Sequence, residues 1–363
     1  MNPLFLKKID GSIGSALTRL LPRPARAVSA TSTVSRLLLI RPGGIGDAVL
    51  LVPAIQALRK VCPDAAIHVL AESRNAAVFG LCPDADAVFC YDRPKELLSV
   101  LGGKYDVVID TEQWHRLSAV VARLIRSQVK IGFGTNERQR LFTHAISYEQ
   151  GFYEKESFSR LLEPLGCTGR VADSVPFLSV PEVARQKASE LLDGLVEAPF
   201  VVFFPGASIP ERRWGAERFR DVAAWCRERG LPVVVVGGRE DTGAGDAIVA
   251  AGWGINLSAK TSLAQTAAVI EQSTLLVSGD SGVLHLGVGL GKPTVSLFGS
   301  GIAAKWAPRG ERHVVLNKNL PCSPCTKFGY TPPCPINATC LSEISVADVT
   351  AAIETLLARL ELS

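Results

Sequence analysis

A short polar loop in the carboxyl-terminal half of this 363-residue chain has the residue types that bind an anion. The loop is Gly279-Asp280-Ser281-Gly282; an apolar run precedes it, and apolar residues at helical spacing follow it as far as Leu290. The first N–H groups of a helix point outward and its dipole favours negative charge, so a phosphate can bind at Ser281 and Gly282. Asp280 would then bind sugar hydroxyls or cap the helix. The alternative is that Asp280 or Ser281 is an N-cap and nothing more.

A second candidate is Asp47, at the first turn of a predicted helix. It follows a tight turn that contains Gly44 and Gly46. The arrangement is typical of a dinucleotide-binding site, but Val49 stands where that fingerprint has its third glycine. Asp47 is therefore a carboxylate beside glycines that let another molecule approach closely. Its alternative role is an N-cap or a partner of the helix dipole.

Two further loops combine small and charged residues at the ends of predicted strands. One carries Ser208, Arg212 and Arg213, and the other carries Gly238 and Glu240. Arginines beside small residues can neutralise a diphosphate, and the planar guanidinium suits that geometry. The alternative for the two arginines is a solvated pair at the start of a helix.

Four of the nine cysteines lie within nineteen residues of a proline-rich stretch. Cys322, Cys325, Cys334 and Cys340 are separated by two, eight and five residues, which favours a closed tetrahedral zinc or iron site. The alternative is two local disulfides, which proteins of reducing compartments do not normally keep oxidised. The other five cysteines are predicted to be reduced core residues: Cys62, Cys82, Cys90, Cys167 and Cys226.

We expect two domains to position these residues, because a chain of 363 residues is too long to fold around one hydrophobic core of ordinary size. Strands alternate with helix-length segments in both halves, which predicts mostly parallel sheets covered on both faces. The predicted strands are 36–40, 66–70, 87–91, 106–110 and 130–133, then 200–204, 232–236, 255–257, 274–277, 294–298 and 313–316. The predicted helices are 48–60, 74–80, 94–101, 115–127 and 182–195, then 216–229, 243–251, 262–272, 283–290 and 345–360. The expected organisation is a basic leader and linker (1–35), an N-terminal Rossmann-like domain (36–180), an interdomain connection (181–198), a C-terminal Rossmann-like domain (199–345) with a cysteine-rich loop (320–341), and a final helix (346–363). The second of these domains is expected to hold most of a nucleotide.

Composition excludes several classes of protein. The chain is 47% hydrophobic and 20% charged, and it has no apolar run of about 20 residues, so no transmembrane helix is expected. The net charge is +4, but residues 1–36 hold six basic residues and one acidic residue. The remaining chain is close to neutral, which argues against nucleic-acid binding.

The basic leader places apolar residues along one side of a helix, and its cations lie mostly elsewhere. Those apolar residues are Leu4, Phe5, Ile9, Ile13, Ala16, Leu17, Leu20 and Leu21. Such a helix can lie in a membrane surface, with its leucines among acyl chains and its cations near anionic headgroups. It can equally pack on the body of the protein or form a frayed tail. A secretory signal fits less well, because Arg19 interrupts the apolar segment.

Three motifs in this order resemble glycosyltransferase family 9, the lipopolysaccharide heptosyltransferases. They are IRPGGIGDAVLLVPAI, FPGASIPERRW and SGDSGVLHLGVGLGKPTVSLFG. The resemblance spans roughly 36–308 and implies a GT-B fold, in which two Rossmann-like domains face each other across a cleft. It also implies an ADP-heptose donor, inversion at the anomeric carbon and no catalytic metal or other catalytic cofactor.

The resemblance implies roles for particular residues. Asp47 corresponds to the general base, with Gly44 and Gly46 on the acceptor side or in its loop. Arg212 stands where many members have a lysine near the donor phosphates. Further donor-binding residues would be Ser208, Glu240, Asp280, Ser281, Gly282 and His285. Glu240 lies near a family glutamate that holds the adenosine ribose. Some members that modify autotransporter proteins are similar in the cysteine-rich loop, where they carry a four-cysteine iron site of structural role.

The leading hypothesis is an inverting heptosyltransferase that takes ADP-heptose and a lipid-linked glycan acceptor during lipopolysaccharide core assembly. It would be cytoplasmic and peripheral at the inner face of the membrane. One alternative is a family member that uses another nucleotide sugar or glycosylates a protein. The other is a catalytically idle nucleotide-sugar-binding or scaffold protein. Measuring ADP release with candidate acceptors would separate the three.

Overall fold

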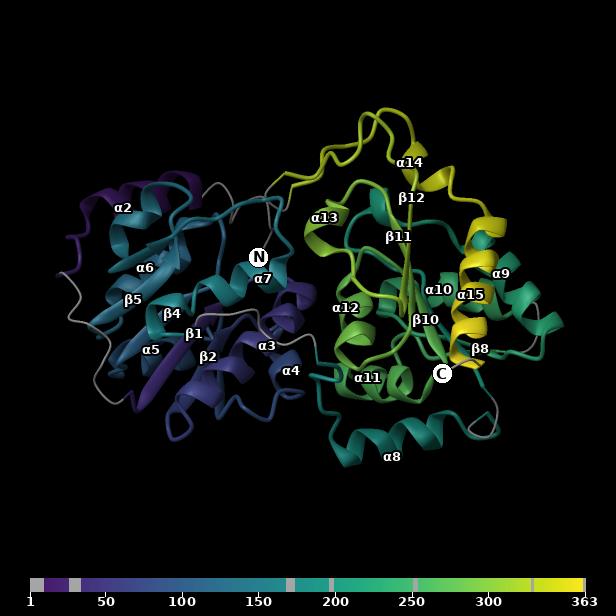
Figure 1. Cartoon of the computed structure of the whole chain (residues 1–363), viewed down its shortest axis with the longest axis horizontal. Helices are drawn as coiled ribbons and strands as arrows, with labels where there is room; N and C mark the ends of the chain where they lie inside the picture. Colours follow the sequence, from purple (N-terminus) through teal and green to yellow (C-terminus); the bar gives the residue numbers. More distant parts are fainter. Residues whose placement is uncertain are drawn as a thin grey trace. The chain divides into compact units, whose positions relative to one another are not determined.

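The computed structural model describes residues 10–25, 34–167, 174–195, 199–250, 254–327 and 330–361. The chain divides into two compact units, Met1–Asp173 and Ser174–Ser363 (Figure 1). Each unit is built on one six-stranded sheet whose strands pair in parallel. Within the described residues, no helix has the length and apolar character needed to cross a membrane.

The first unit has the strand order β3-β2-β1-β4-β5-β6. Its strands are β1 (Arg36–Arg41), β2 (Ala66–Ala71), β3 (Ala87–Cys90), β4 (Val107–Asp110), β5 (Val129–Phe133) and β6 (His144–Ile146). Its α-helices are α2 (Ser15–Leu20), α3 (Ile45–Val61), α4 (Ala76–Phe79), α5 (Pro94–Gly102), α6 (Arg116–Leu124) and α7 (Glu154–Arg160). A π-helical turn, η1 (Asp10–Gly14), precedes α2, and η2 (Glu137–Leu141) and η3 (Glu163–Leu165) are short 3-10 helices. The five strands predicted in this half are confirmed, whereas β6 and α7 were not expected.

Strand β1 shows why this sheet is buried on both faces. Leu37 and Leu39 are fully buried on one side of the strand, and Leu38 and Ile40 pack on the other side in a cluster that includes residues of α5 and α6. Side chains alternate between faces along a strand. A continuous apolar run is therefore buried only when other elements pack on both faces of the sheet.

The second unit has the strand order β12-β11-β10-β7-β8-β9. Its strands are β7 (Val201–Phe204), β8 (Val233–Val235), β9 (Gly254–Asn256), β10 (Leu275–Gly279), β11 (Thr294–Phe298) and β12 (His313–Asn317). Its α-helices are α8 (Glu182–Leu191), α9 (Ala216–Glu228), α10 (Thr242–Val249), α11 (Leu263–Gln272), α12 (Gly282–Gly289), α13 (Ala303–Trp306), α14 (Thr339–Ser342) and α15 (Val346–Glu361). The 3-10 turns η4 (Pro210–Arg212) and η5 (Arg239–Asp241) follow β7 and β8. All six strands predicted here are present.

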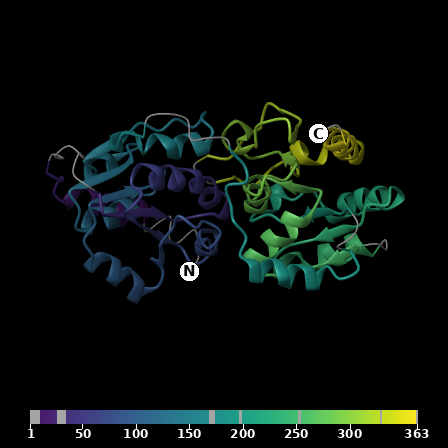
Figure 2. The ribbon, with the colours of Figure 1, turned by 60° about the horizontal axis from the view of Figure 1, so that its bottom comes forward.

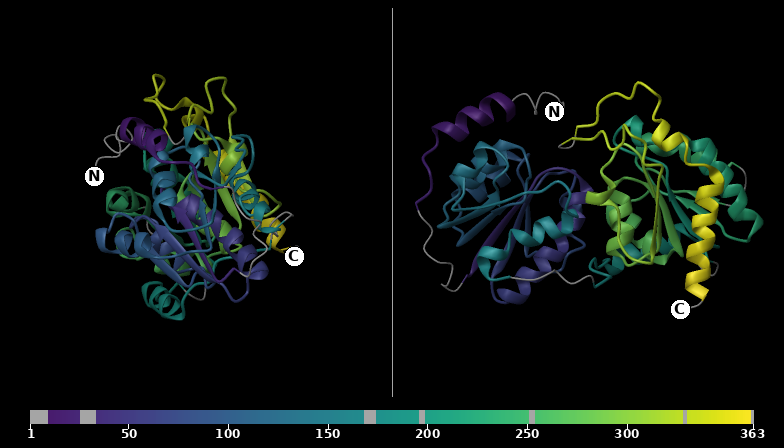
Figure 3. Two further views of the ribbon diagram at one scale, coloured as in Figure 1. Left: turned by 90° about the vertical axis from the view of Figure 1, so that its left-hand side faces the viewer. Right: turned by 45° about the horizontal axis from the view of Figure 1, so that its top comes forward.

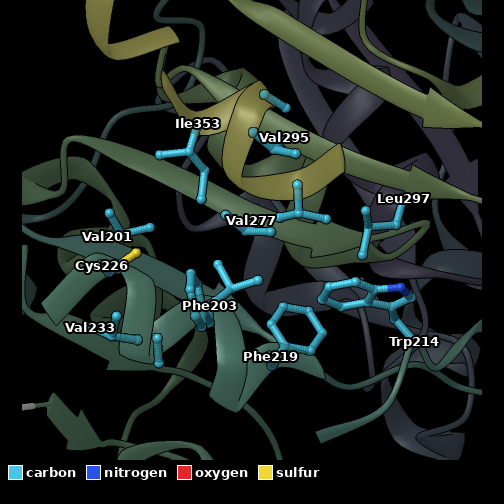
Figure 4. Packing of buried hydrophobic residues seen from close by; sticks show 14 of the residues in the cluster. Val201, Phe203, Trp214, Phe219, Cys226, Val233, Val277, Val295, Leu297 and Ile353 are labelled. Atoms are coloured by element: carbon cyan, nitrogen blue, oxygen red, sulfur yellow. The ribbon is translucent and has the colours of Figure 1, made fainter. Parts of the chain in front are cut away.

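Helices cover both faces of this second sheet. Helices α9, α10 and α15 lie on one side, whereas α11 and α12 lie on the other, and the same layers are visible in Figure 2. The α9 and α15 side of the core contains Phe203, Phe219 and Trp214, whose rings pack edge to face or tilted at 5.2–5.4 Å between centroids (Figure 4). Ile353 brings α15 into the same cluster, so the final helix belongs to the core of this unit.

The described part of the leader packs on the first unit, where α2 lies beside α6 (Figures 1 and 3). The Asp10 carboxylate accepts hydrogen bonds from the backbone N–H groups of Arg116 and Leu117, at 2.7 and 2.8 Å, and so caps α6. Leu17 and Leu21 pack against the core of that unit. The leader residues 1–9 and 26–33, which include Leu4 and Phe5, lie outside the described residues.

Candidate active site

Asp47 lies at the point where the strand order of the first sheet reverses. Strands β1 and β4 are neighbours in space although β2 and β3 come between them in the chain, and the loops after β1 and β4 leave the same edge. Such a reversal at the carboxyl ends of parallel strands is where α/β sheets bind ligands. Asp47 is in the first turn of α3, directly after the β1 loop, and is half-buried.

Buried ion pairs hold the loops behind Asp47. Arg41 bonds to the backbone carbonyl of Thr111 at 2.9 Å and to Glu112 at 3.2 Å, and Arg138 pairs with Asp110. All four charged side chains are nearly inaccessible to solvent. Burial opposes ionisation of Glu112, but the charges of Arg41, His115 and Arg138 together outweigh it and hold the pKa of that carboxyl below its usual range. Asp110 and Glu112 therefore serve to fix the edge of the sheet.

A tyrosine near Asp47 was not anticipated from the sequence. The Tyr148 hydroxyl donates to Glu154 at 2.9 Å, and the amide of Gln113 donates to the other oxygen of Glu154. Burial raises the pKa of Tyr148, and the charges of Glu154 and Asp47 raise it further. Tyr148 thus stays a neutral hydroxyl close to Asp47. The only sequence signal for this group was a polar stretch with weak periodicity between β6 and α7.

The glycine that the β1 loop requires is Gly43, which has φ of +101°. Gly44 has an extended backbone as the N-cap of α3, and a Cβ on it would meet nothing within 4 Å. Gly46 lies within α3 itself. The acceptor-side roles of Gly44 and Gly46 stay predictions.

The second sheet also reverses its order, between β7 and β10, and the predicted donor loops leave that edge. Arg212, in the loop after β7, forms an ion pair with Asp280, in the loop after β10, with 3.0 Å between Nη1 and Oδ2. Asp280 is buried and only 18% of the Arg212 side chain is exposed, so Arg212 is not a solvated helix-start residue. The structure brings these two predicted site residues together.

Ser281 is the N-cap of α12, and its hydroxyl accepts from the backbone N–H of Leu284 at 3.2 Å. This confirms a capping role for Ser281 and leaves the N–H groups of Gly282 and Val283 without acceptors inside the helix. An anion can use those two groups. His285, one turn further, is 3% exposed.

The remaining predicted donor residues lie on loops of the same edge. Ser208 and Glu240 are exposed, after β7 and in η5 respectively. Beside them Asp241, which sequence reasoning missed, is buried and accepts the backbone N–H of Gly238 at 2.9 Å. A Cβ on Gly206 would lie 2.5 Å from an Asp241 oxygen, so these two loops are packed tightly together. Burial raises the pKa of Asp241.

All nine cysteines are free thiols, so the structure shows no local disulfides. Cys340 is buried, Cys325 and Cys334 are half-buried and Cys322 is exposed. Burial raises the pKa of Cys325, and the nearby Cys334 and Cys322 thiols raise it further, so the three thiols are neighbours. Among the described residues, however, no group of three or more histidine, cysteine, aspartate or glutamate side chains is arranged to hold a metal ion.

The two edges differ in the chemistry they can perform. The first presents a half-buried carboxylate, which can accept a proton. The second presents a guanidinium and the start of a helix, which together can bind a diphosphate and stabilise charge that develops on it.

Known proteins resemble this chain over most of its length. The family model described as glycosyltransferase family 9 (heptosyltransferase) matches residues 96–332. Lipopolysaccharide heptosyltransferase 3 of Escherichia coli is 27% identical over 288 residues, which cover 72% of this chain and 83% of that protein.

Solved structures show the same fold. A family 9 glycosyltransferase from Veillonella parvula DSM 2008 has a TM-score of 0.75 and 24% identity, covering 92% of this chain and 100% of that one. Escherichia coli ADP-heptose lps heptosyltransferase II has a TM-score of 0.71 and 22% identity, covering 90% and 99%. The GT-B fold expected from the sequence is therefore confirmed, and the chain belongs to glycosyltransferase family 9, the heptosyltransferase family.

Proposed function

We propose that this glycosyltransferase transfers heptose from ADP-heptose to a lipopolysaccharide core acceptor with inversion at the anomeric carbon and without a catalytic metal. The observation that carries the proposal is the Arg212–Asp280 ion pair beside the start of α12, at the reversal point of the second sheet. The similarity to lipopolysaccharide heptosyltransferase 3 of Escherichia coli supports the choice of sugar and acceptor.

The second unit would hold the donor. Arg212 and the N–H groups of Gly282 and Val283 would bind the diphosphate, and Glu240 and Ser208 would contact the nucleoside. As the bond from the anomeric carbon to the diphosphate breaks, negative charge grows on the leaving phosphate. A fixed cation and a helix start stabilise that charge and need no reorganisation to do so.

Asp47 would act as the general base. The acceptor hydroxyl attacks the anomeric carbon from the side opposite the leaving diphosphate, so the configuration inverts, and its proton passes to the Asp47 carboxylate. Burial and the charge of Glu154 raise the pKa of Tyr148, so this residue would place a neutral hydroxyl near Asp47 without adding a second charge.

The experiment compares Asp47→Asn with the parent enzyme, using ADP release with ADP-heptose and deacylated core acceptors. Asp47→Asn should lower kcat by about two to four orders of magnitude and leave ADP affinity within about twofold. Asp64→Asn, an exposed carboxylate just after α3, is the matched control and should behave like the parent. If ADP affinity collapsed with Asp47→Asn, Asp47 would be a binding or structural residue.

The same assay tests the alternatives. Turnover with a different nucleotide sugar, or only with a protein acceptor, would replace the proposed substrates. Donor binding without turnover on any acceptor would favour an idle binding or scaffold protein.

We further propose that the cysteine-rich loop 320–341 holds a structural zinc or iron ion through Cys322, Cys325, Cys334 and Cys340. The thiols are neighbours but are not arranged as a completed site, so binding would require the loop to close around the ion. With four protein ligands the ion has no open coordination position, so its role would be structural and not catalytic.

Metal analysis of protein purified without chelator tests this site. About one zinc or iron per chain is expected in the parent and in Cys62→Ser, and its loss is expected in Cys325→Ser. A parent protein without bound metal would end the proposal.

Finally, we propose that the enzyme works at the cytoplasmic face of the membrane, where its leader contacts lipid. Ile13 and Leu20 are 51% and 80% exposed on η1 and α2, and the basic Arg19 and Arg23 lie on the same segment. Exposed apolar side chains beside cations fit an anionic lipid surface.

A further inference from the structure

The cysteine-rich loop reaches the proposed donor site through one buried threonine. Thr326 directly follows Cys325 and is 2% exposed. Nη2 of Arg212 donates to its hydroxyl at 3.3 Å, although 114 positions separate the two residues in the chain. Neither Arg212 contact, to Thr326 or to Asp280, could have been inferred from its sequence neighbours.

Chemistry fixes the direction of the hydrogen bond between Arg212 and Thr326. A guanidinium has donors only, so the Thr326 oxygen must accept from Arg212. The Thr326 hydroxyl proton is then free to go to the Thr331 hydroxyl, which lies at 2.7 Å. A threonine suits this position because its hydroxyl can accept from Arg212 and still form a second hydrogen bond with Thr331.

The guanidinium of Arg212 is therefore held through two of its nitrogen atoms. Nη1 pairs with Asp280 at 3.0 Å and Nη2 bonds to Thr326, which leaves little freedom for the plane of the group to rotate. Asp280 alone would fix only Nη1. The orientation of an arginine fork decides whether it meets a diphosphate with two parallel bonds or with one.

The loop that carries Thr326 is itself anchored to the donor edge. The backbone N–H groups of Cys325 and Thr326 both donate to the Ser300 carbonyl, at 3.2 and 3.0 Å. The next residue, Gly301, packs so closely on Asp280 that a Cβ there would lie 2.0 Å from Oδ2. Thr326 thus has a fixed position relative to both partners of the ion pair.

We propose that Thr326 is a positioning residue that orients Arg212 for binding the diphosphate of the donor, and that the cysteine-rich loop thereby sets donor affinity. The inference rests on the proposed function, because it takes Arg212 as the diphosphate ligand. It gives the loop a role in substrate binding beyond stabilising the fold. Thr326 acts only through Arg212 and contacts no reacting atom.

The test measures ADP binding by calorimetry for the full-length Thr326→Val, Thr326→Ser and Thr355→Val variants. Loss of one hydrogen bond to a charged group should weaken ADP binding about tenfold in Thr326→Val. Thr326→Ser keeps the hydroxyl and should stay within about twofold of the parent. Thr355 is an exposed threonine on α15, so Thr355→Val should match the parent.

Two outcomes would overturn the inference. One is an ADP affinity in Thr326→Val within about twofold of the parent. The other is equal weakening in Thr326→Ser and Thr326→Val together with equal loss of melting temperature, which would mean that Thr326 only packs the loop.

Arg212→Ala separates failure of the inference from failure of the proposed function. If Arg212→Ala leaves ADP affinity unchanged, the proposed donor site is wrong and the role of Thr326 falls with it. If Arg212→Ala weakens ADP binding and Thr326→Val does not, the donor site stands and only the positioning role is lost.

Discussion

At the scale of single residues, the second unit holds the guanidinium of Arg212 in an ion pair at the proposed donor site. Arg212 is only 18% exposed and is paired with Asp280, so the charge of the pair is partly cancelled before any ligand arrives. The directional N–H groups then matter more than net charge, because each one aims at a definite oxygen. An arginine can serve Asp280, Thr326 and a phosphate simultaneously; a lysine ammonium cannot match that planar geometry.

A double-mutant cycle tests this view of Arg212. Arg212→Lys should weaken ADP binding about three- to tenfold, because the ammonium cannot keep both protein contacts and the phosphate contact. Adding Thr326→Val to Arg212→Lys should change affinity by less than about twofold, since the threonine then has no guanidinium to orient. Calorimetry with ADP gives the four affinities. Additive losses in the double variant would contradict a route through Arg212.

Sequence motifs predicted part of this site and missed part of it, for a physical reason. Asp280, Ser281 and Arg212 belong to loops that can be recognised from a strand, a turn and a helix start close together in sequence. Thr326 and Asp241 have no such local signature: one acts across 114 positions and the other is defined by its burial against Gly206. Contacts of that kind become visible only once the chain is folded.

At the scale of elements, strong periodicity predicted well and weak periodicity did not. Every apolar residue of β1 and β10 is buried, and both strands were predicted from the sequence. Strand β6 has three residues, none of them fully buried, and lies at an edge of its sheet. Helix α7, EKESFSR, buries a glutamate and a serine, which no amphipathic pattern would indicate. In both cases tertiary contacts override local preference.

Strand β12 carries a histidine that should make the second unit sensitive to acid. Burial lowers the pKa of His313 to about 4, while the unfolded chain has the ordinary value of 6.5. Between pH 6.5 and 4 the unfolded state binds more protons, so the free energy of unfolding should fall as the pH drops through this window. The loss should be on the order of 2 kcal/mol by pH 4.

His313→Gln isolates this effect. Urea unfolding of the parent and of His313→Gln between pH 7 and 4 should show a smaller loss of stability in the variant as the pH falls, since the variant lacks the titrating ring. Parallel curves would mean that His313 titrates normally in the folded state.

At the scale of the whole molecule, the division into two α/β units follows from length and from the alternation of strands and helices. The leader was harder to interpret, because its apolar residues suit either a membrane or a protein surface. The structure supports packing for the described part: Asp10 caps α6, and Arg19 pairs with Glu137 at 3.2 Å. Ile13 and Leu20 nevertheless remain exposed, so one segment can serve both purposes.

Two substitutions separate these purposes. Leu20→Glu should greatly reduce sedimentation of the enzyme with phosphatidylglycerol vesicles and leave its melting temperature unchanged. Asp10→Ala should lower stability by about 1 kcal/mol through loss of the α6 cap and leave vesicle binding intact. Leu98→Glu, at a similarly exposed leucine on α5, is the control. Full vesicle binding by Leu20→Glu would exclude this residue from lipid contact.

The close approach of Gly301 to Asp280 limits how this enzyme can be altered in the laboratory. Any side chain at position 301 would collide with Oδ2 at 2.0 Å, and the carboxylate cannot retreat while it is tied to Arg212. Randomised libraries that aim to change which sugar nucleotide is accepted should therefore keep position 301 as glycine and diversify Ser208 and Glu240, the exposed residues that we propose contact the nucleoside.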